Sequence, residues 1–143
     1  MKTLIFLFVT SCCFSQSIVL NVDFKNTKKE VLNNITNQKG FELAENRENE
    51  LTFRSGTLFE EKLSLSIFQF QNDTLKNAFF YFKHSKHHGE HVEKIINSVS
   101  NLFKKEQTDD IWQLNKLKIQ IDRDLFSETS IKEVGLMFYR QKQ

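Results

Sequence analysis

The clearest hydrophobic pattern in the chain predicts an amphipathic helix over residues 92–103. Apolar residues recur there at positions i, i+3, i+4, i+7, i+10 and i+11, which lie on one face of an α-helix. They are Val92, Ile95, Ile96, Val99, Leu102 and Phe103. A second helix is predicted over residues 28–38. Thr27 and Glu30 have the spacing of a capping box at its start, and Gly40 is a typical residue just after a helix end.

Short segments in which apolar and polar residues alternate, as in half-buried strands, account for most of the remaining chain. They span residues 18–24, 41–43, 51–53, 63–70, 78–82, 112–114, 117–122 and 134–138. Asn72, Asp73 and Thr74 form a predicted hairpin turn between two of these strands. The whole pattern predicts an α+β fold, in which one antiparallel sheet of six to eight strands has two helices packed on one face.

Two neighbouring predicted strands, 63–70 and 78–82, carry apolar residues on both faces. One interpretation is a central strand pair that helices cover on one side and a loop or a curled sheet covers on the other. The second interpretation is that one face is exposed and recognises a protein or peptide, because contiguous exposed apolar area marks interaction sites. On this second interpretation the anchors are large and rigid side chains, namely Phe68, Phe70, Phe80 and Tyr81.

Composition limits the functions that this chain can have. Its 143 residues suffice for one domain with a single core, and 39% of them are hydrophobic, including 15 Phe. The 20 basic and 18 acidic residues nearly cancel, which argues against nucleic acid as a partner, since nucleic-acid binders present a strongly basic surface. Only 4 Gly and no Pro are present, so Gly-rich phosphate-binding loops and Pro-rich linkers are excluded.

The N-terminal segment predicts that the protein is exported. Lys2 precedes the apolar run Leu4–Val9 and then small residues, which is the layout of a secretory signal peptide. The run is shorter than the about 20 apolar residues that span a bilayer. The expected organisation is therefore a signal peptide, residues 1–15, followed by a single α+β domain, residues 16–143.

Two outcomes of processing remain open. Cleavage after Ser15 would release a periplasmic or secreted protein. Alternatively, residues 9–12 (Val-Thr-Ser-Cys) resemble a lipoprotein box, in which Cys12 is lipidated and the chain is attached to the outer membrane. A membrane is an expected partner only in the second case. Cys12 and Cys13 are the 2 cysteines of the chain, so no disulfide, thiolate metal site or cysteine nucleophile is expected in the domain itself.

All 4 histidines lie within eight residues, as His84, His87, His88 and His91. Pairs that are four residues apart would share one face of a helical turn, and imidazole nitrogens bind Zn²⁺ or Cu²⁺, so one hypothesis is a metal site with zinc as cofactor. A second hypothesis is a solvated connector between a strand and a helix. A third is a surface patch that becomes charged on mild acidification, because the ordinary pKa of histidine is about 6.5.

No residue pattern selects a catalytic site, so a non-catalytic protein is expected. The chain has no Gly-x-Ser-x-Gly elbow, and every histidine lies in one predicted loop. Adjacent carboxylates occur at Glu60–Glu61 and at Asp109–Asp110, but nothing in the sequence selects a glycosidase pair. The sequence therefore favours binding over hydrolysis.

The order of the predicted elements resembles that of a group of exported proteins. Gly40 with Phe41, the strand that ends at Asn72–Leu75, and Trp112 before the last hairpin carry this resemblance. In these features residues 18–140 resemble small exported proteins of Bacteroidetes. Their layout looks like the two-helix, curved-sheet modules of the β-lactamase-inhibitor-protein type and of the outer-membrane assembly lipoproteins. Such modules bind other proteins, so the resemblance implies a non-catalytic binding module of the cell envelope.

Overall fold

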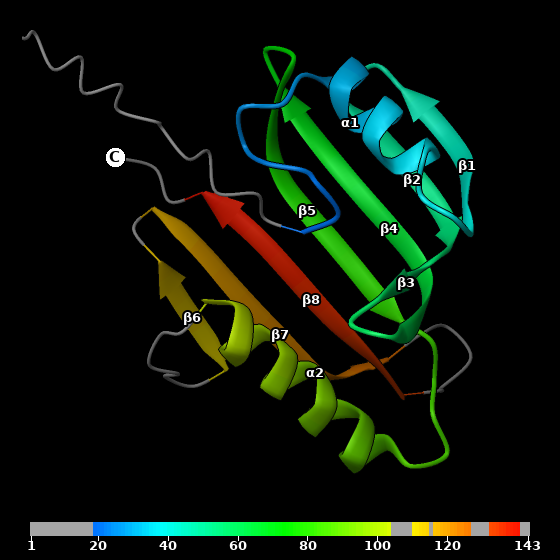
Figure 1. Ribbon diagram of the computed structural model, residues 1–143, viewed down its shortest axis with the longest axis vertical. Coiled ribbons are helices and arrows are strands. Elements are labelled where there is room, and N and C mark those ends of the chain that lie inside the picture. Colours follow the sequence, from blue (N-terminus) through cyan, green and yellow to red (C-terminus); the bar gives the residue numbers. More distant parts are fainter. Residues whose placement is uncertain (1–18, 104–109, 115, 127–131, 141–143) are drawn as a thin grey trace, which may run out of the picture.

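An antiparallel sheet of eight strands forms the centre of the protein, and two helices pack on one of its faces (Figure 1). The computed structural model describes residues 19–103, 110–114, 116–126 and 132–140. The helices are α1, Lys28–Thr36, and α2, His88–Phe103. The strands are β1, Phe41–Arg47; β2, Glu50–Ser55; β3, Thr57–Leu58; β4, Glu61–Gln71; β5, Thr74–Phe82; β6, Ile111–Leu114; β7, Leu117–Phe126; and β8, Lys132–Arg140.

The two halves of the chain meet in the middle of one sheet. The strand order is β1-β2-β4-β5-β8-β7-β6, and the two-residue strand β3 pairs with β4 beside this series. All the pairings are antiparallel, and β5 joins β8 across the centre. The predicted α+β class, the size of the sheet and the pair of helices on one face are confirmed.

A row of phenylalanine rings crosses the helix-covered face of the sheet and forms much of the core. The rings of Phe53, Phe68, Phe80 and Phe138 follow one another from β2 to β8, with consecutive centroids 5.9, 5.7 and 5.8 Å apart and nearly perpendicular planes. Phe103 of α2 packs on Phe138 at 5.9 Å. Because this helix contacts the row, the row marks the face of the sheet that belongs to the core.

The start of α1 has the predicted capping box. The Oγ1 atom of Thr27 accepts a hydrogen bond from the backbone N–H of Glu30 (3.3 Å), and the carboxylate of Glu30 accepts one from the backbone N–H of Thr27 (2.7 Å). Val31 and Ile35 are the buried residues of this helix, which packs against β1 and β2. The predicted helix is therefore confirmed, although it ends at Thr36.

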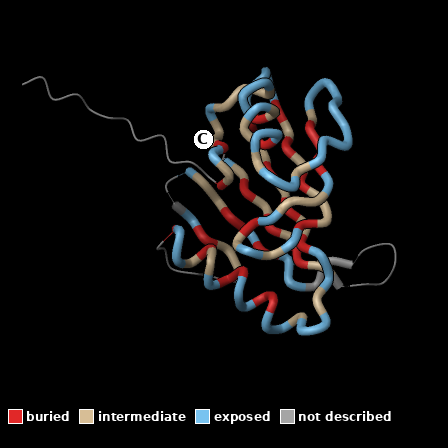
Figure 2. Tube along the Cα trace, turned by 45° about the vertical axis from the view of Figure 1, so that its right-hand side comes forward, coloured by how far each residue is buried: buried red, intermediate tan, exposed pale blue. Residues whose placement is uncertain are grey.

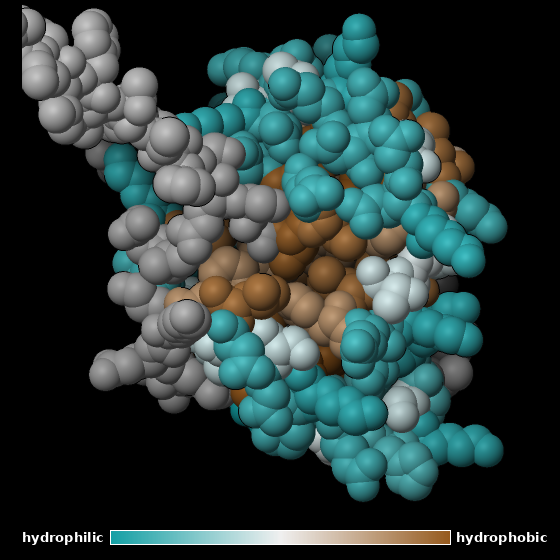
Figure 3. All heavy atoms as spheres, in the orientation of Figure 1, coloured by the Kyte–Doolittle hydropathy of each residue, from teal (hydrophilic) through white to brown (hydrophobic). Residues whose placement is uncertain are grey.

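The apolar stripe of α2 faces the core, with one exception. Its buried residues are His91, Val92, Ile95, Ile96, Val99 and Phe103. Leu102, which the helical spacing placed in the same stripe, is 54% exposed. Trp112 of β6 is fully buried, and its Nε1 donates a hydrogen bond to Ser100 Oγ of α2 (3.1 Å). From the helix side, apolar side chains gather between α1 and α2 inside a hydrophilic rim (Figure 3).

The segment predicted as a first strand, residues 18–24, is instead a tight turn in its described part. Leu20 and Asn21 have φ angles of 54° and 59°, in the left-handed region, and the backbone N–H of Val22 donates to the carbonyl oxygen of Val19 (2.9 Å). The turn brings both valines into the core. The prediction was wrong because a β-rich run of side chains does not reveal a reversal of the backbone.

The predicted hairpin turn after β4 is confirmed. Asn72 and Asp73 have φ angles of 51° and 56°, as a two-residue turn between antiparallel strands requires.

The charged stretch 45–50, which lacks an apolar pattern, contains the end of β1 and the first residue of β2. The residues of this stretch that belong to β1 are exposed. They are polar because β1 is an edge strand of the sheet, and not because they lie in a loop.

The predicted signal peptide, residues 1–15, and the lipidation site Cys12 lie outside the described residues, so both stay predictions. The longer of the two described helices, α2, has 16 residues. Within the described part of the chain, neither helix has the length and apolar character that crossing a membrane would require.

Candidate functional site: the open face of the sheet

Along the central strands β4 and β5, buried residues alternate with half-buried ones (Figure 2). The buried residues face the helices and include Phe68 and Phe80 of the phenylalanine row. The half-buried residues lie on the opposite side of the sheet, here called the open face because both described helices lie on the other side. In a sheet with one solvated face, this second set is normally polar.

The middle of the open face is apolar. Strand register places Ile67 of β4 opposite Phe79 of β5, and Phe79 opposite Met137 of β8. On one side of this row, Leu65 lies opposite Tyr81. The half-buried apolar and aromatic residues of the three central strands form what we call the central patch. It consists of Leu65, Ile67, Phe79, Tyr81, Met137 and Tyr139.

Polar residues frame the central patch on the strands at its sides. On β2, Thr52 lies opposite Ile67, and Arg54 lies opposite Leu65. On β7, Lys118 lies opposite Tyr139. An apolar centre with a polar rim is the arrangement found in protein–protein interfaces, where the centre is desolvated and the rim stays in contact with water.

One row of polar side chains on this face is fixed by hydrogen bonds across three strands. Gln69 Nε2 of β4 donates to Glu50 Oε2 of β2 (3.2 Å), and Asn77 Nδ2 of β5 donates to Gln69 Oε1 (3.1 Å). In register, Asn77 lies opposite Tyr139 of the central patch. These bonds hold the two amide groups in one orientation.

A depression of about 180 Å³ lies in the open face at Gly135 of β8. Gly135 stands between Tyr81 of β5 and Asp122 of β7 in the register, so the absence of a side chain leaves a gap between them. Phe79 and Gln120 also line the depression. Burial raises the pKa of the Tyr81 phenol above its ordinary value of 10.0, so its hydroxyl group remains a hydrogen-bond donor at neutral pH.

The structure corrects three of the four predicted anchors. Phe68 and Phe80 are fully buried and Phe70 is 6% exposed, so these three rings belong to the core and do not reach the surface of this fold. Tyr81 is half-buried on the open face and stays a candidate. Sequence reasoning missed the remaining residues of the central patch, which are Leu65, Ile67, Phe79, Met137 and Tyr139. Alternation along a strand divides its residues between the two faces of the sheet. It does not reveal which of the two faces the helices cover.

The four histidines do not share one environment. His84 and His87 are exposed, whereas His91 is only 5% exposed and packs edge-on against Phe82, with ring centroids 6.0 Å apart. His91 Nε2 lies 3.4 Å from Glu61 Oε2, and neither ring nitrogen has a hydrogen-bond partner among the described residues.

Burial lowers the pKa of His91 below its ordinary value. The carboxylate of Glu61 raises the pKa of His91, and electrostatic interactions with His88, Lys94 and His84 lower it further. His91 is therefore a neutral core residue at neutral pH and not part of a solvated connector.

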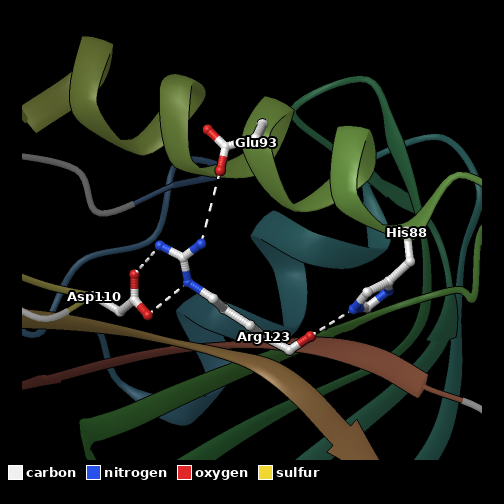
Figure 4. Close-up of polar contacts among 4 residues, drawn as sticks. All are labelled: His88, Glu93, Asp110 and Arg123. Atoms are coloured by element: carbon white, nitrogen blue, oxygen red, sulfur yellow. Dashed lines mark hydrogen bonds and ion pairs between the residues drawn. The ribbon is translucent and has the colours of Figure 1, made fainter.

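His88 belongs to a polar cluster that joins the start of α2 to β7 and β6 (Figure 4). Its Nε2 lies 2.7 Å from the carbonyl oxygen of Arg123. The guanidinium group of Arg123 donates two hydrogen bonds to the carboxylate of Asp110, at 2.6 and 2.5 Å, and lies 3.7 Å from Glu93 of α2. The cluster ties these elements together and presents no nucleophile beside a base.

The predicted metal site receives no geometric support. Among the described residues, no three histidine, cysteine or acidic side chains are grouped as metal ligands. The role of these histidines as zinc or copper ligands therefore stays a prediction; they are His84, His87, His88 and His91.

Asp110, one of the adjacent carboxylates noted in the sequence, forms an ion pair with Arg123.

Together, the fold and the open face define a class of protein, namely an α+β domain whose antiparallel sheet is covered by helices on one face and carries an apolar patch on the other. Comparison with protein-family models, with curated proteins and with solved structures found no match to this chain. The residues of the open face are therefore the basis for inferring what the protein does.

Proposed function

We propose that this protein is an exported, non-catalytic binding module of the cell envelope that recognises a protein or peptide through the open face of its sheet. The observation that carries the proposal is the central patch. Three adjacent strands present half-buried apolar and aromatic side chains on the side of the sheet that the described helices leave uncovered. Apolar patches rimmed by polar residues are typical of interaction sites in soluble proteins.

The chemistry of the patch suits a protein or peptide. Phe79, Tyr81 and Tyr139 are aromatic, and aromatic residues and methionine are enriched at the centres of protein interfaces. The depression at Gly135, about 180 Å³, is smaller than the enclosed pockets of about 300–1,000 Å³ that usually hold small molecules and cofactors. The predicted signal peptide, residues 1–15, supports export, and the resemblance to envelope binding modules agrees with both parts of the proposal.

The experiment is the selection of peptides from a random display library on the purified protein. We expect the selected peptides to lose binding to a Phe79→Ser variant, because serine removes the largest apolar side chain in the middle row of the patch. Met137→Ser, in the same row, serves as a second variant should Phe79→Ser fail to fold.

The matched control is Leu102→Ser, which removes an exposed apolar side chain from α2 on the other side of the molecule. Selected peptides should bind this variant as they bind the wild type. The proposal fails if selection yields no peptide whose binding depends on the open face, or if Leu102→Ser weakens binding as much as Phe79→Ser does.

A further inference from the structure

We propose that a second depression, beside the central patch, binds a neutral saccharide of one or two sugar rings. Residues 47–50, 69–71 and 76–77 line this depression, here called the polar depression. Its volume, about 460 Å³, lies within the about 300–1,000 Å³ of pockets that hold small molecules. The inference goes beyond the proposed function, because it adds a ligand of a different chemical class at a different site.

Strand register builds the polar depression around a row of polar side chains, one from each of four neighbouring strands. They are Arg47 of β1, Glu50 of β2, Gln69 of β4 and Asn77 of β5. Gln69 and Asn77 stand two residues from Ile67 and Phe79, so they lie on the same face of the sheet as the central patch. Because neighbouring strands are about 4.8 Å apart, the row extends over about 14 Å, which gives room for more than one sugar ring.

The charges that line the polar depression cancel. Arg47 and Lys76 are its cations, and Glu48 and Glu50 are its anions. The guanidinium group of Arg47 is already paired with the carboxylate of Glu45, at 2.6 Å. Balanced charges give an ionic ligand no net attraction, so this lining favours a ligand that is polar but uncharged.

Amide groups are the commonest groups of the lining. Four side chains contribute them, namely Asn49, Gln69, Gln71 and Asn77. An amide holds a donor and an acceptor side by side, and a hydroxyl group both donates and accepts, so neighbouring hydroxyl groups of a sugar ring match each amide. The side chains of Asn49 and Gln71 have no hydrogen-bond partner among the described residues, so both amides are available to a ligand.

The lining offers little to an apolar side chain, which separates this site from the central patch. Phe70 is the aromatic residue of the lining, and it is only 6% exposed. On β8, the half-buried Tyr139 lies opposite Asn77 and continues the row. Its ring can pack against the C–H groups of a sugar at the end of the row. Hydroxyl groups on an apolar ring therefore suit this arrangement better than the side chains of a peptide do.

The test is an NMR titration of the purified protein with the neutral disaccharides maltose, cellobiose, lactose and N,N′-diacetylchitobiose. Binding is followed through the backbone N–H signals of Glu50, Gln69 and Asn77. The comparison ligand is N-acetyl-glutamine methylamide, which offers amide groups like those of a peptide but no ring hydroxyl groups. We expect saturable shifts of these signals with at least one disaccharide, and at least about tenfold weaker binding of the comparison ligand.

Two variants locate the effect. Gln69→Leu keeps the size of the side chain but removes the amide that bonds to both Glu50 and Asn77, and it should weaken disaccharide binding at least about tenfold. Asn77→Ala removes the next amide of the row, should also weaken binding, and decides the matter if Gln69→Leu does not fold. The matched control is Gln120→Leu, the same substitution at an exposed position of β7 outside the polar depression, which should leave binding unchanged.

The inference is overturned if no disaccharide shifts these signals, or if the comparison ligand binds as tightly as the disaccharides, because the depression would then be a peptide site. Undiminished binding in Gln69→Leu and Asn77→Ala would also overturn it, as would an equal loss in Gln120→Leu. None of these outcomes decides the proposed function, which is tested by selected peptides and Phe79→Ser.

Discussion

Ser66 places a hydroxyl group in the aromatic core without a hydrogen-bond partner among the described residues. It lies between Phe53 and Phe80 in the register of the sheet. A buried polar group that is not hydrogen-bonded lowers stability. We therefore expect Ser66→Ala to raise the free energy of unfolding by about 1 kcal/mol, measured by urea denaturation.

A neighbour on the same strand provides the control for this prediction. The Oγ atom of Ser64 donates a hydrogen bond to the carbonyl oxygen of Tyr81 (3.0 Å), so Ser64→Ala should leave stability unchanged or lower it. A loss of stability in Ser66→Ala equal to that in Ser64→Ala would contradict the account of Ser66.

His91 makes the stability of the protein depend on pH. Burial lowers its pKa in the folded state, so the unfolded chain takes up the proton at a higher pH than the folded protein does. The stabilisation is fully present above the ordinary pKa of about 6.5 and is lost as the pH falls toward the lower pKa of the folded state. We expect the free energy of unfolding to be smaller at pH 5.5 than at pH 7.5.

Replacement of the buried imidazole tests this dependence. His91→Leu should diminish the difference in the free energy of unfolding between the two pH values, because leucine does not titrate. His87→Gln, at an exposed histidine, should retain the difference. Equal differences in both variants would show that another group is responsible.

At the scale of the elements, the capping box of α1 carries a prediction of its own. Thr27→Ala removes the oxygen that accepts from the backbone N–H of Glu30, and it should lower the free energy of unfolding by about 1 kcal/mol. Thermal or urea unfolding measures this loss. Lys29→Ala, at an exposed position in the same helix, is the control and should change stability little. An unchanged stability in Thr27→Ala would mean that packing alone holds the start of the helix.

Most elements could be predicted from the sequence, because periodicity reports local burial. The helical spacing of residues 92–103 located α2, and the alternation in residues 63–70 located β4. The failure at residues 18–24 arose because Leu20 and Asn21 take left-handed backbone angles that no hydrophobic pattern encodes. The two-residue strand β3 has no periodicity to detect.

The candidate site was harder to predict than the elements that carry it. Phe79 and Phe80 are adjacent and equally apolar, and only the position of the helices decides which of them lies in the core. That choice depends on long-range packing, since a strand with two apolar faces is compatible with either side being covered. The sequence therefore identified β4 and β5 as strands with two apolar faces, but three of the four predicted anchors lie in the core.

At the scale of the whole molecule, the open face combines residues that are distant in the sequence. β4 and β5 contribute residues 65 to 81, whereas β7 and β8 contribute residues near 120 and 137. The pairing of β5 with β8 unites them, and it places Gly135 between Tyr81 and Asp122. No local pattern predicts this juxtaposition, so the depression could be found only in the folded protein.

The two faces of the sheet should respond differently to the same substitution. Phe80 is fully buried in the phenylalanine row, so Phe80→Ser should lower the free energy of unfolding by about 4 kcal/mol. Phe79 is half-buried on the open face, so Phe79→Ser should lower the free energy of unfolding by at most about 1.5 kcal/mol. A half-buried ring contributes only part of the free energy that a fully buried ring contributes.

The most direct test of the account is therefore urea denaturation of Phe79→Ser beside Phe80→Ser, followed by circular dichroism under identical conditions. We predict that Phe79→Ser remains folded and loses at most about 1.5 kcal/mol, whereas Phe80→Ser loses about 4 kcal/mol, as expected if Phe79 lies on an open face that a partner can reach. Equal, large losses in the two variants would contradict this prediction, because they would place Phe79 in a second core and leave no open face for binding.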